Sequence, residues 1–282
     1  MKEVIEWLKP EPGKIFVDAT LGLGGHTKAI LEASAPLGMV YAFDWNKESM
    51  EIAKERLKEF EGRVKYIPKN FTAINETLQR AGILVDGVLL DLGLSSFLLE
   101  GSGRGFTFQK DEPLDMRMSE EIKITAKDIL KRARFEELWD ILQSGEVPRA
   151  KAFAKYLIER RKYKSFETTR DLVSAVIDFY KPSPKKEKDI LALVFQAFRI
   201  RVNRELENLE KALRDVPEIL KVGGRFVVIS YHSLEDRLVK RAFQNDVRLR
   251  VLTKKPIIPS LEEIRRNPRA RSAKMRVAER RY

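Results

Sequence analysis

Short apolar runs alternate with helix-patterned stretches through the first third of the chain. Four of these runs have the length of buried strands, and three end in an aspartate. The stretches between them place apolar residues at helical spacing. Strands that alternate with helices predict a mostly parallel, doubly wound sheet. The expected strands are 15–18, 39–44, 64–67 and 85–91, and the expected helices are 4–8, 25–34, 49–60 and 74–81.

This alternation stops after Leu92. A glycine- and serine-rich loop at 92–118 is too long and too aromatic for an idle connector. Helical patterns fill 125–180 and 189–220, and a strong strand pattern returns at 225–230, before a helix at 234–244. We therefore expect an α/β protein whose sheet domain, 1–102 and 198–282, is interrupted by an all-helical domain at 103–197.

Composition excludes several classes of protein. The chain has 282 residues, 43% of them hydrophobic, which is enough for a packed core. It has no cysteine, so disulfides and thiolate metal sites are excluded. No apolar run approaches the roughly 20 residues of a membrane span, and the start MKEVIEWLKP lacks the apolar region of a signal peptide. A cytoplasmic protein is expected.

Positive charge gathers in two blocks. The net charge is +12, yet residues 241–282 hold 13 Lys/Arg against 4 Asp/Glu, and residues 149–170 hold 8 against 2. The remainder of the chain is slightly acidic. Two basic blocks on a near-neutral body suggest a polyanionic partner, although each could also be a solvated face.

The stretch FVDATLGLGGH at 16–26 is the first candidate site. It joins a strand to a helix through Gly22, Gly24 and Gly25, which allow backbone N–H groups to approach a ligand closely. Asp44 ends the next strand, where Rossmann-like folds hold a ribose diol. Thr27 stands where the third glycine of the dinucleotide motif would be, so a plain tight turn followed by a strand-end acid stays an alternative.

Seven segments together resemble the bacterial 16S rRNA cytosine-N4 methyltransferase family, which depends on S-adenosylmethionine. They span nearly the whole chain in the family's order, and few of the strings are generic. The segments are GLGGH (22–26), LLDLGLSS (89–96), RGFTF (104–108), PLDMRM (113–118), FQAFRIRVNRELE (195–207), GGRFVVISYHSLEDRLVKR (223–241) and NPRARSAKMRVAER (267–280).

The resemblance implies a class I, Rossmann-like methyltransferase sheet with an inserted helical domain for substrate recognition. It also implies methylation of the N4 atom of a cytidine in the decoding centre of 16S rRNA, within the small ribosomal subunit. The cofactor would be S-adenosylmethionine, with Asp44 at the ribose, Phe71 at the adenine and Asp91 near the methyl donor. Its other implied contacts are Gly22, Gly24, Gly25, His26 and Leu98.

The chain departs from the family pattern at three places. The family usually has a glutamine that contacts the cofactor where this chain has Leu98, which cannot make a polar contact. The usual His-x-Pro-Val lead is missing ahead of MKEVIEWLKP, and residues 189–193 replace an expected His-Pro-Ala segment.

Methyl transfer to an exocyclic amine defines the candidate catalytic residues. The cytosine amine is a poor nucleophile, so acceptors for its N–H groups and its proton are needed. Asp91, Ser95 and His232 are the candidates, with His232 either a proton acceptor or a substrate clamp. Asp115, Arg117 and Arg199 are candidate substrate contacts, although Asp115 and Arg117 could equally form an ion pair that fixes the loop. No metal is expected, because the donor is already an electrophile.

Two functions from other classes stay open on the residues alone. A dinucleotide-dependent oxidoreductase would also use a glycine turn and Asp44, but it would leave the basic blocks unused. A non-catalytic rRNA-binding assembly protein would use the basic blocks alone and would need neither Asp44 nor Asp91.

Overall fold

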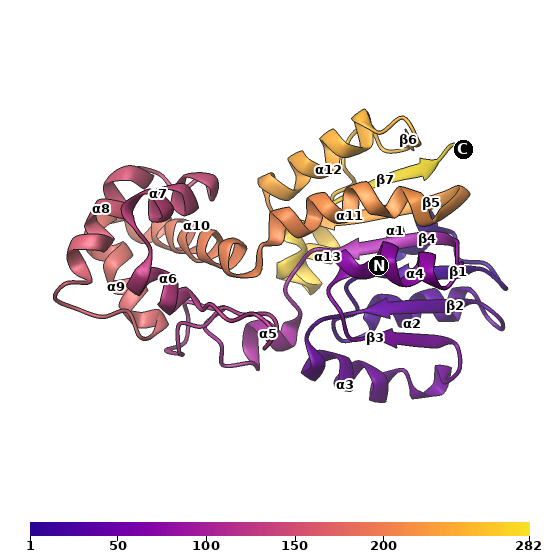
Figure 1. The fold of residues 1–282 in the computed structure, drawn as a ribbon, viewed down its shortest axis with the longest axis horizontal. Helices are drawn as coiled ribbons and strands as arrows, with labels where there is room; N and C mark the ends of the chain where they lie inside the picture. Colours follow the sequence, from indigo (N-terminus) through magenta and orange to yellow (C-terminus); the bar gives the residue numbers. More distant parts are fainter. The chain divides into compact units, whose positions relative to one another are not determined.

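The structure is a computed structural model that describes residues 1–282, and it divides into two compact units (Figure 1). The sheet unit comprises Met1–Ser95 and Leu206–Tyr282. The helical unit comprises Ser96–Glu205, so both of its bounds lie outside the expected 103–197. The chain thus leaves the sheet unit directly after the fourth strand and returns at the start of a helix.

A seven-stranded sheet forms the middle layer of the sheet unit. Its strand order is β3-β2-β1-β4-β5-β7-β6, and every strand is parallel to its neighbours except β7, which is antiparallel to β5 and β6. The strands are β1 (Ile15–Asp18), β2 (Met39–Phe43), β3 (Val64–Ile67), β4 (Val85–Asp91), β5 (Leu220–Ser230), β6 (Leu249–Val251) and β7 (Lys274–Arg280). The predicted α/β class and its first five strands are confirmed.

The C-terminal strands were not predicted. Residues 241–282 were interpreted only as a basic block, but Met275, Val277 and Ala278 of β7 are buried in the sheet. Charged residues flank and interrupt these apolar positions, so the high charge concealed a strand whose four middle residues, Met275 to Ala278, are all buried.

Helices cover both faces of the sheet and bury two apolar clusters. On one face, α1 (Lys2–Leu8), α2 (Gly25–Ala33) and α3 (Lys47–Arg56) pack against residues such as Phe16 and Val227. On the other face, α4 (Ile74–Arg80), α11 (Glu205–Ile219) and α12 (Ser233–Asn245) pack against residues such as Val88 and Phe226. Strands buried on both faces explain the continuous apolar runs in the sequence.

The sheet unit contains two further short helical segments near the end of the chain. They are α13 (Leu261–Arg266) and the 3-10 helix η3 (Pro268–Ser272), which lie between β6 and β7 in the chain. Two further 3-10 helices, η1 (Lys58–Phe60) and η2 (Phe71–Ala73), flank β3. No helix of the structure has both the length and the apolar character required to cross a bilayer.

The helical unit contains six helices and only one isolated bridge, between Pro113 and Thr168. Helices α6 and α9 each begin with a capping box, formed by Thr125 with Asp128 and by Thr168 with Asp171. Such caps satisfy the free N–H groups of a first helical turn. The helices are α5 (Ser96–Glu100), α6 (Ala126–Arg132), α7 (Phe135–Ser144), α8 (Ala150–Arg160), α9 (Thr169–Tyr180) and α10 (Pro184–Asn203).

One expected helix is two helices. The stretch 189–220 was expected to be continuous, but Arg204 adopts a left-handed conformation (φ 52°) and ends α10 before α11 begins. The preceding Asn203 is 1% exposed, and its amide donates to the carbonyls of Met116 and Arg199. The break lies at the boundary between the two units, and the spacing of apolar residues in the sequence gives no sign of it.

Candidate functional site

The carboxyl ends of adjacent parallel strands gather the polar residues of the sheet unit. Asp18 ends β1, Asp44 follows β2 and Asp91 ends β4. His232 follows β5, which pairs with β4 so that Ile229 lies opposite Asp91. The carboxyl edge of a parallel sheet is where such folds bind ligands. These side chains therefore define the candidate site.

The glycine turn between β1 and α2 requires glycine at two positions. Gly22 and Gly24 have positive φ angles of 51° and 81°, which favour a residue without a Cβ. A Cβ on Gly24 would also lie 3.0 Å from Leu57 Cδ1, so the turn is packed closely against the α3 end. The turn is held at its start, where Leu21 N–H donates to the Phe43 carbonyl.

Asp44 ties the glycine turn to the second strand. Its Oδ2 accepts a hydrogen bond from Gly22 N–H and its Oδ1 accepts one from Asn46 N–H, each at 2.8 Å. Burial raises the pKa of Asp44 to about 6, against the opposing effect of these backbone donors. The carboxylate retains lone pairs beyond those the backbone uses, so it can accept further hydrogen bonds such as those from a ribose diol.

Asp18 is an organising residue that the sequence analysis did not select. It is fully buried, accepts from Thr27 Oγ1 at 2.7 Å and accepts from Thr20 N–H at 3.2 Å. Burial raises its pKa. Thr20 in turn accepts the backbone N–H of Asp91 on its Oγ1 at 2.7 Å. Asp18 thus joins the glycine turn to the start of α2. The signal in the sequence was a carboxylate and two threonines around the glycines.

Asp91 lies between two partners on its two oxygens. Tyr231 Oη donates to Asp91 Oδ1 at 2.9 Å, and His26 Nε2 lies 3.3 Å from Asp91 Oδ2. Burial disfavours the charged imidazole of His26, but the Asp91 hydrogen bond and the Asp91 and Asp18 charges raise its pKa overall. Its Nδ1 is buried and has no hydrogen-bond partner. The structure therefore brings the predicted His26 and Asp91 together.

Ser95 and Phe71 lie on the same unit. Ser95 Oγ is 3.5 Å from Ser49 Oγ, and a Cβ on Gly22 would lie 3.7 Å from the Ser95 Cβ. Ser95 is therefore adjacent to the glycine turn. Phe71 begins η2 after β3 and packs, half-buried, against the core cluster of α4 and α11. Its position at the sheet edge agrees with an adenine-bordering role, which stays a prediction.

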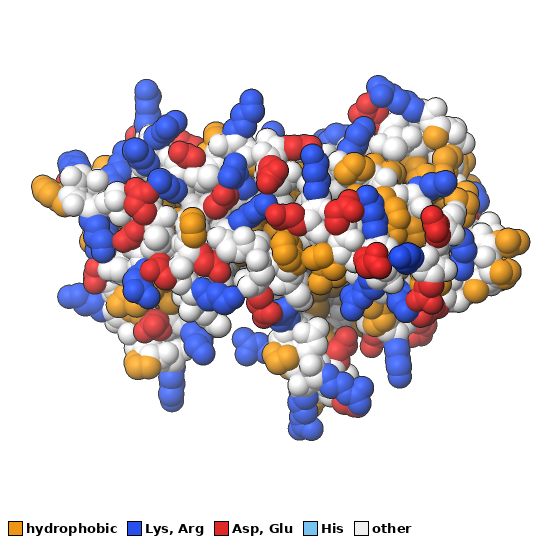
Figure 2. All heavy atoms as spheres, turned by 90° about the horizontal axis from the view of Figure 1, so that it is seen from below, with side chains coloured by type: hydrophobic (Ala, Val, Ile, Leu, Met, Phe, Trp, Pro, Cys, Tyr) orange, Lys and Arg blue, Asp and Glu red, His pale blue; other side chains and the backbone are white.

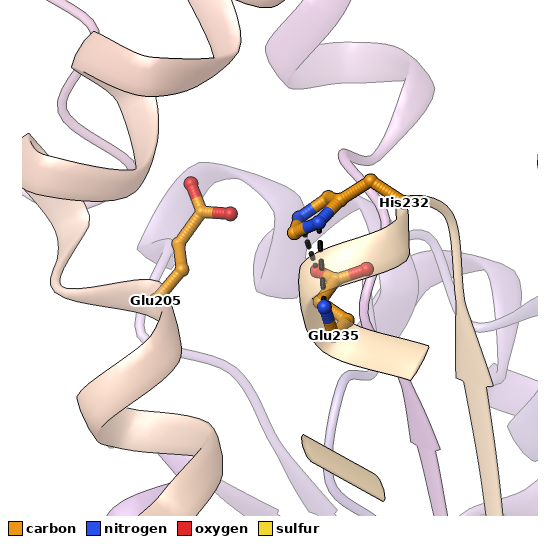
Figure 3. A group of neighbouring side chains, drawn as sticks. All are labelled: Glu205, His232 and Glu235. Carbon is orange, nitrogen blue, oxygen red and sulfur yellow. Dashed lines mark hydrogen bonds and ion pairs between the residues drawn. The ribbon is translucent and has the colours of Figure 1, made fainter. Parts of the chain in front are cut away.

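His232 caps α12 rather than standing free. Its Nδ1 accepts a hydrogen bond from Glu235 N–H at 3.4 Å (Figure 3). Glu235 Oε2 in turn accepts Tyr231 N–H at 2.8 Å. A neutral imidazole whose Nδ1 accepts must carry its hydrogen on Nε2. That Nε2 lies 3.1 Å from Glu235 Oε1 without hydrogen-bond geometry, and it is a buried atom with no hydrogen-bond partner. The arrangement therefore favours His232 Nε2 as a hydrogen-bond donor rather than as a proton acceptor.

The candidate substrate residues belong to the helical unit and are ion-paired there. Arg117 binds both oxygens of Asp115 at 2.7 Å and also donates to the Ile122 carbonyl. The alternative of an ion pair that fixes the loop is thus observed for these two residues. Arg199 binds both oxygens of Glu205 at 2.9 Å. The Leu98 side chain is buried, and its carbonyl accepts the Ser102 hydroxyl. Roles for these residues in substrate or cofactor binding stay predictions.

Comparison with solved structures agrees with this architecture. The chain resembles the crystal structure of a Clostridium thermocellum protein assigned as an rRNA-methylase, with a TM-score of 0.50 and 13% identity. The match covers 99% of this chain and 94% of that one. At this identity the likeness shows the fold alone.

Comparison with family models decides the family. The model of the MraW methylase family matches residues 1–281. The chain belongs to this family. Relatives include the ribosomal RNA small subunit methyltransferase H of Desulfotalea psychrophila, 45% identical over 99% of this chain and 96% of the relative. The protein of the same name from Thermotoga neapolitana is 47% identical over 99% of this chain and 94% of the relative.

Membership of the MraW methylase family confirms the prediction of an S-adenosylmethionine-dependent methyltransferase, and it decides against the oxidoreductase alternative. The residues of the site fit that cofactor. The glycine turn leaves backbone exposed at Gly25, Asp44 offers a strand-end carboxylate, and a buried His26 Nδ1 lacks a partner. The departure at Leu98 removes one polar contact that the resemblance implied.

Proposed function

We propose that this protein methylates the small-subunit ribosomal RNA, at the exocyclic N4 atom of a cytidine in the decoding centre of 16S rRNA. The observation that carries the proposal is the junction of the glycine turn with Asp91 through His26 and Thr20. This junction lies in a chain that matches relatives named ribosomal RNA small subunit methyltransferase H over nearly its whole length.

The cofactor supplies a methyl group on a positively charged sulfur, which is an electrophile without further activation. We assign its ribose to Asp44, because that carboxylate ends β2 and has acceptor capacity left. We assign its adenine to the edge bordered by Phe71, and its methionine end to Gly24, Gly25, His26 and Asp91. The negative Asp91 carboxylate suits the cationic ammonium of that end.

The nucleophile must be held in line with the donor and relieved of a proton. Correct alignment of two reacting groups can account for roughly 7–11 kcal/mol of a barrier. The Nε2–H of His232 is a buried donor without a hydrogen-bond partner, so we assign it as the substrate clamp for an acceptor on the pyrimidine ring that enters the site. Asp91 and Ser95 have oxygen atoms that can accept an amine hydrogen. The proton thus goes to one of these oxygens or to water rather than to His232.

The helical unit offers an RNA-facing element at the end of α8. The Tyr163 side chain is 89% exposed and stands between Lys162 and Lys164. Its turn is fixed, because Tyr163 N–H donates to the Arg160 carbonyl while the Arg160 side chain binds Tyr156, Ser174 and Asp178. A rigidly presented aromatic ring beside lysines suits stacking on an unpaired base with phosphates alongside.

Charge is mixed rather than segregated on the face of the protein that Figure 2 presents. Figure 2 shows blue Lys and Arg side chains interspersed with red acidic ones across the face it presents. Many lysines also have an acidic neighbour, as Lys162 has Glu159 and Lys164 has Asp171. Exposed pairs of this kind contribute little and are readily exchanged for phosphate contacts. RNA binding is therefore expected to depend strongly on salt.

Methylation in vitro tests the proposal. Small ribosomal subunits that lack the modification are incubated with the protein and S-adenosylmethionine, and the rRNA is digested and analysed by mass spectrometry. We expect N4-methylcytidine at one decoding-centre position. The matched control is the Asp91→Ala variant under the same conditions, which should give no product. A methylated product on a different atom or base would contradict the assignment.

A further inference from the structure

We propose that Tyr231 is a positioning residue for the Asp91 carboxylate, acting with His26 to fix the orientation of that carboxylate at the cofactor edge. The proposal rests on the proposed function for its catalytic meaning, but its structural content does not depend on the RNA substrate. Neither the family resemblance nor the strand-end pattern identified Tyr231.

The two partners of Asp91 hold different oxygens. Tyr231 donates to Oδ1 at 2.9 Å and His26 Nε2 lies 3.3 Å from Oδ2, while the Asp91 backbone N–H is held by Thr20 Oγ1. A carboxylate with one partner can rotate about its Cβ–Cγ bond. Two partners on opposite oxygens fix the plane, so the remaining lone pairs point in defined directions.

The backbone around Tyr231 is itself held in place. The Tyr231 N–H donates to Glu235 Oε2 at 2.8 Å, and Glu235 is 2% exposed. The following residue, His232, caps α12. Burial and the adjacent Asp91 charge raise the pKa of the Tyr231 phenol, so it remains a hydrogen-bond donor across the working pH range. The donor therefore keeps both its position and its proton.

Gly93 makes the contact possible. A Cβ at this position would lie 2.8 Å from Tyr231 Cε2, closer than real Cβ contacts allow, and 3.2 Å from Cδ2. The φ angle of Gly93 is not positive, so the residue is not needed for backbone conformation. The absence of a side chain at Gly93 therefore leaves room for the Tyr231 ring to reach the Asp91 carboxylate.

The charge state of His26 reports on this arrangement. The groups that act on the imidazole are Asp91 of β4, Asp18 of β1 and the amino group of Met1, which precedes α1. Removal of the Tyr231 hydroxyl leaves more negative charge on Asp91, which strengthens its attraction for the His26 proton. Loss of the phenol should therefore raise the pKa of His26.

Nitrogen-15 NMR of the imidazoles tests the proposal on the whole protein. The chain has only two histidines, so the His232→Asn variant assigns the spectrum. In Tyr231→Phe, which keeps the ring, the His26 pKa should rise by about half a pH unit or more. The control is Tyr180→Phe, which removes a phenol hydrogen bond to the Pro148 carbonyl in the helical unit and should leave His26 unchanged.

Two further measurements complete the test. Gly93→Ala should shift His26 in the same direction as Tyr231→Phe, because both break the same contact. In methylation assays Tyr231→Phe should raise the KM for S-adenosylmethionine about tenfold with a smaller change in kcat, as expected for loss of one hydrogen bond to a charged group.

The outcomes separate the two proposals. A His26 titration that is identical in the wild type and in folded Tyr231→Phe overturns the positioning role, whatever the activity. A shifted titration with no RNA methylation by the wild type would retain the positioning role and reject the proposed substrate. An equal shift in Tyr180→Phe would show a nonspecific effect and would also overturn the positioning role.

Discussion

Arg276 Nε donates to Asp236 Oδ1 at 2.6 Å, and this pair ties the last strand of the chain to the first turn of α12. Arg276 is 7% exposed, and its guanidinium and Lys274 lower the pKa of Asp236 against the cost of burial. A basic residue of the positively charged C-terminal tail, residues 241–282, is thus a structural element of the sheet. Removal of the tail would take β7 from the centre of the β5–β7–β6 group.

Arg276→Ala should lower the free energy of unfolding by about 3 kcal/mol, because it leaves Asp236 nearly buried without its bidentate partner. Urea unfolding measures the change. Arg265→Ala, in exposed α13, is the matched control and should change stability by less than about 0.5 kcal/mol. Equal stability of the two variants would show that the Arg276 pair contributes nothing.

Asp44→Asn should weaken S-adenosylmethionine binding by about 1.5–3 kcal/mol, because a ribose hydroxyl loses a charged acceptor. Isothermal titration calorimetry measures the affinity. Asp86→Asn is the control. Asp86 accepts hydrogen bonds from Ile15 N–H and Lys221 in the same unit, but it lies at the amino-terminal end of β4, away from the carboxyl ends of the strands. Unchanged affinity in Asp44→Asn would reject the ribose assignment.

Asp44 should also affect stability through pH. Its pKa is raised from 3.8 to about 6, so the folded protein binds this proton more tightly than the unfolded chain. Stability attributable to Asp44 is therefore greatest at low pH and falls as the pH rises through this window. The half-buried carboxylate should account for about 1–3 kcal/mol. Urea unfolding at several pH values should show a flatter dependence for Asp44→Asn than for the wild type.

His232 variants distinguish a clamp from a base. His232→Ala should lose the α12 cap and about 1 kcal/mol of stability, whereas His232→Asn keeps a capping side chain. If His232 is a donor, His232→Asn should retain the acidic limb of the pH profile of kcat. A fall in turnover of about 10²–10⁴ in His232→Asn, with that limb abolished and cofactor affinity intact, would establish a general base instead.

Tyr163→Ala should weaken RNA binding about tenfold through lost stacking, with little change in the salt dependence. Lys162→Gln should instead reduce the slope of log affinity against log salt by about one. Fluorescence anisotropy with an rRNA fragment measures both. Lys65→Gln, on exposed edge strand β3, is the control. Affinity that does not depend on salt would show that the basic blocks are solvated surface.

Local sequence patterns were enough to predict the sheet as far as β5 and the position of its acidic strand ends. Asp44 and Asp91 were found because a polar residue at the end of an apolar run is a local signal. Tyr231 was not found, since its role depends on pairing of β4 with β5 across more than a hundred residues and on the missing Cβ of Gly93. The cap formed by His232 was hidden for the same kind of reason: the sequence shows a histidine, but its Nδ1 acceptor role appears only in three dimensions.

The Lys274–Arg280 strand illustrates a second limit. Its apolar residues Met275, Val277 and Ala278 were present in the sequence, but net charge outweighed them in the interpretation. The break at Arg204 had no apolar signal at all, because both flanking helices are amphipathic. Charge and periodicity should therefore be weighed separately at the ends of a chain.

The interruption of the sheet unit has a consequence for synthesis of the chain. When a ribosome has released residues 1–95, β4 has only β1 beside it, and its other edge is unpaired. That edge stays unpaired until β5 is synthesised, which happens only after the whole of Ser96–Glu205 has been made. The nascent protein thus carries an open strand edge while the helical unit folds, a state prone to edge-to-edge association. The domain order sets the interval during which chaperone protection is needed.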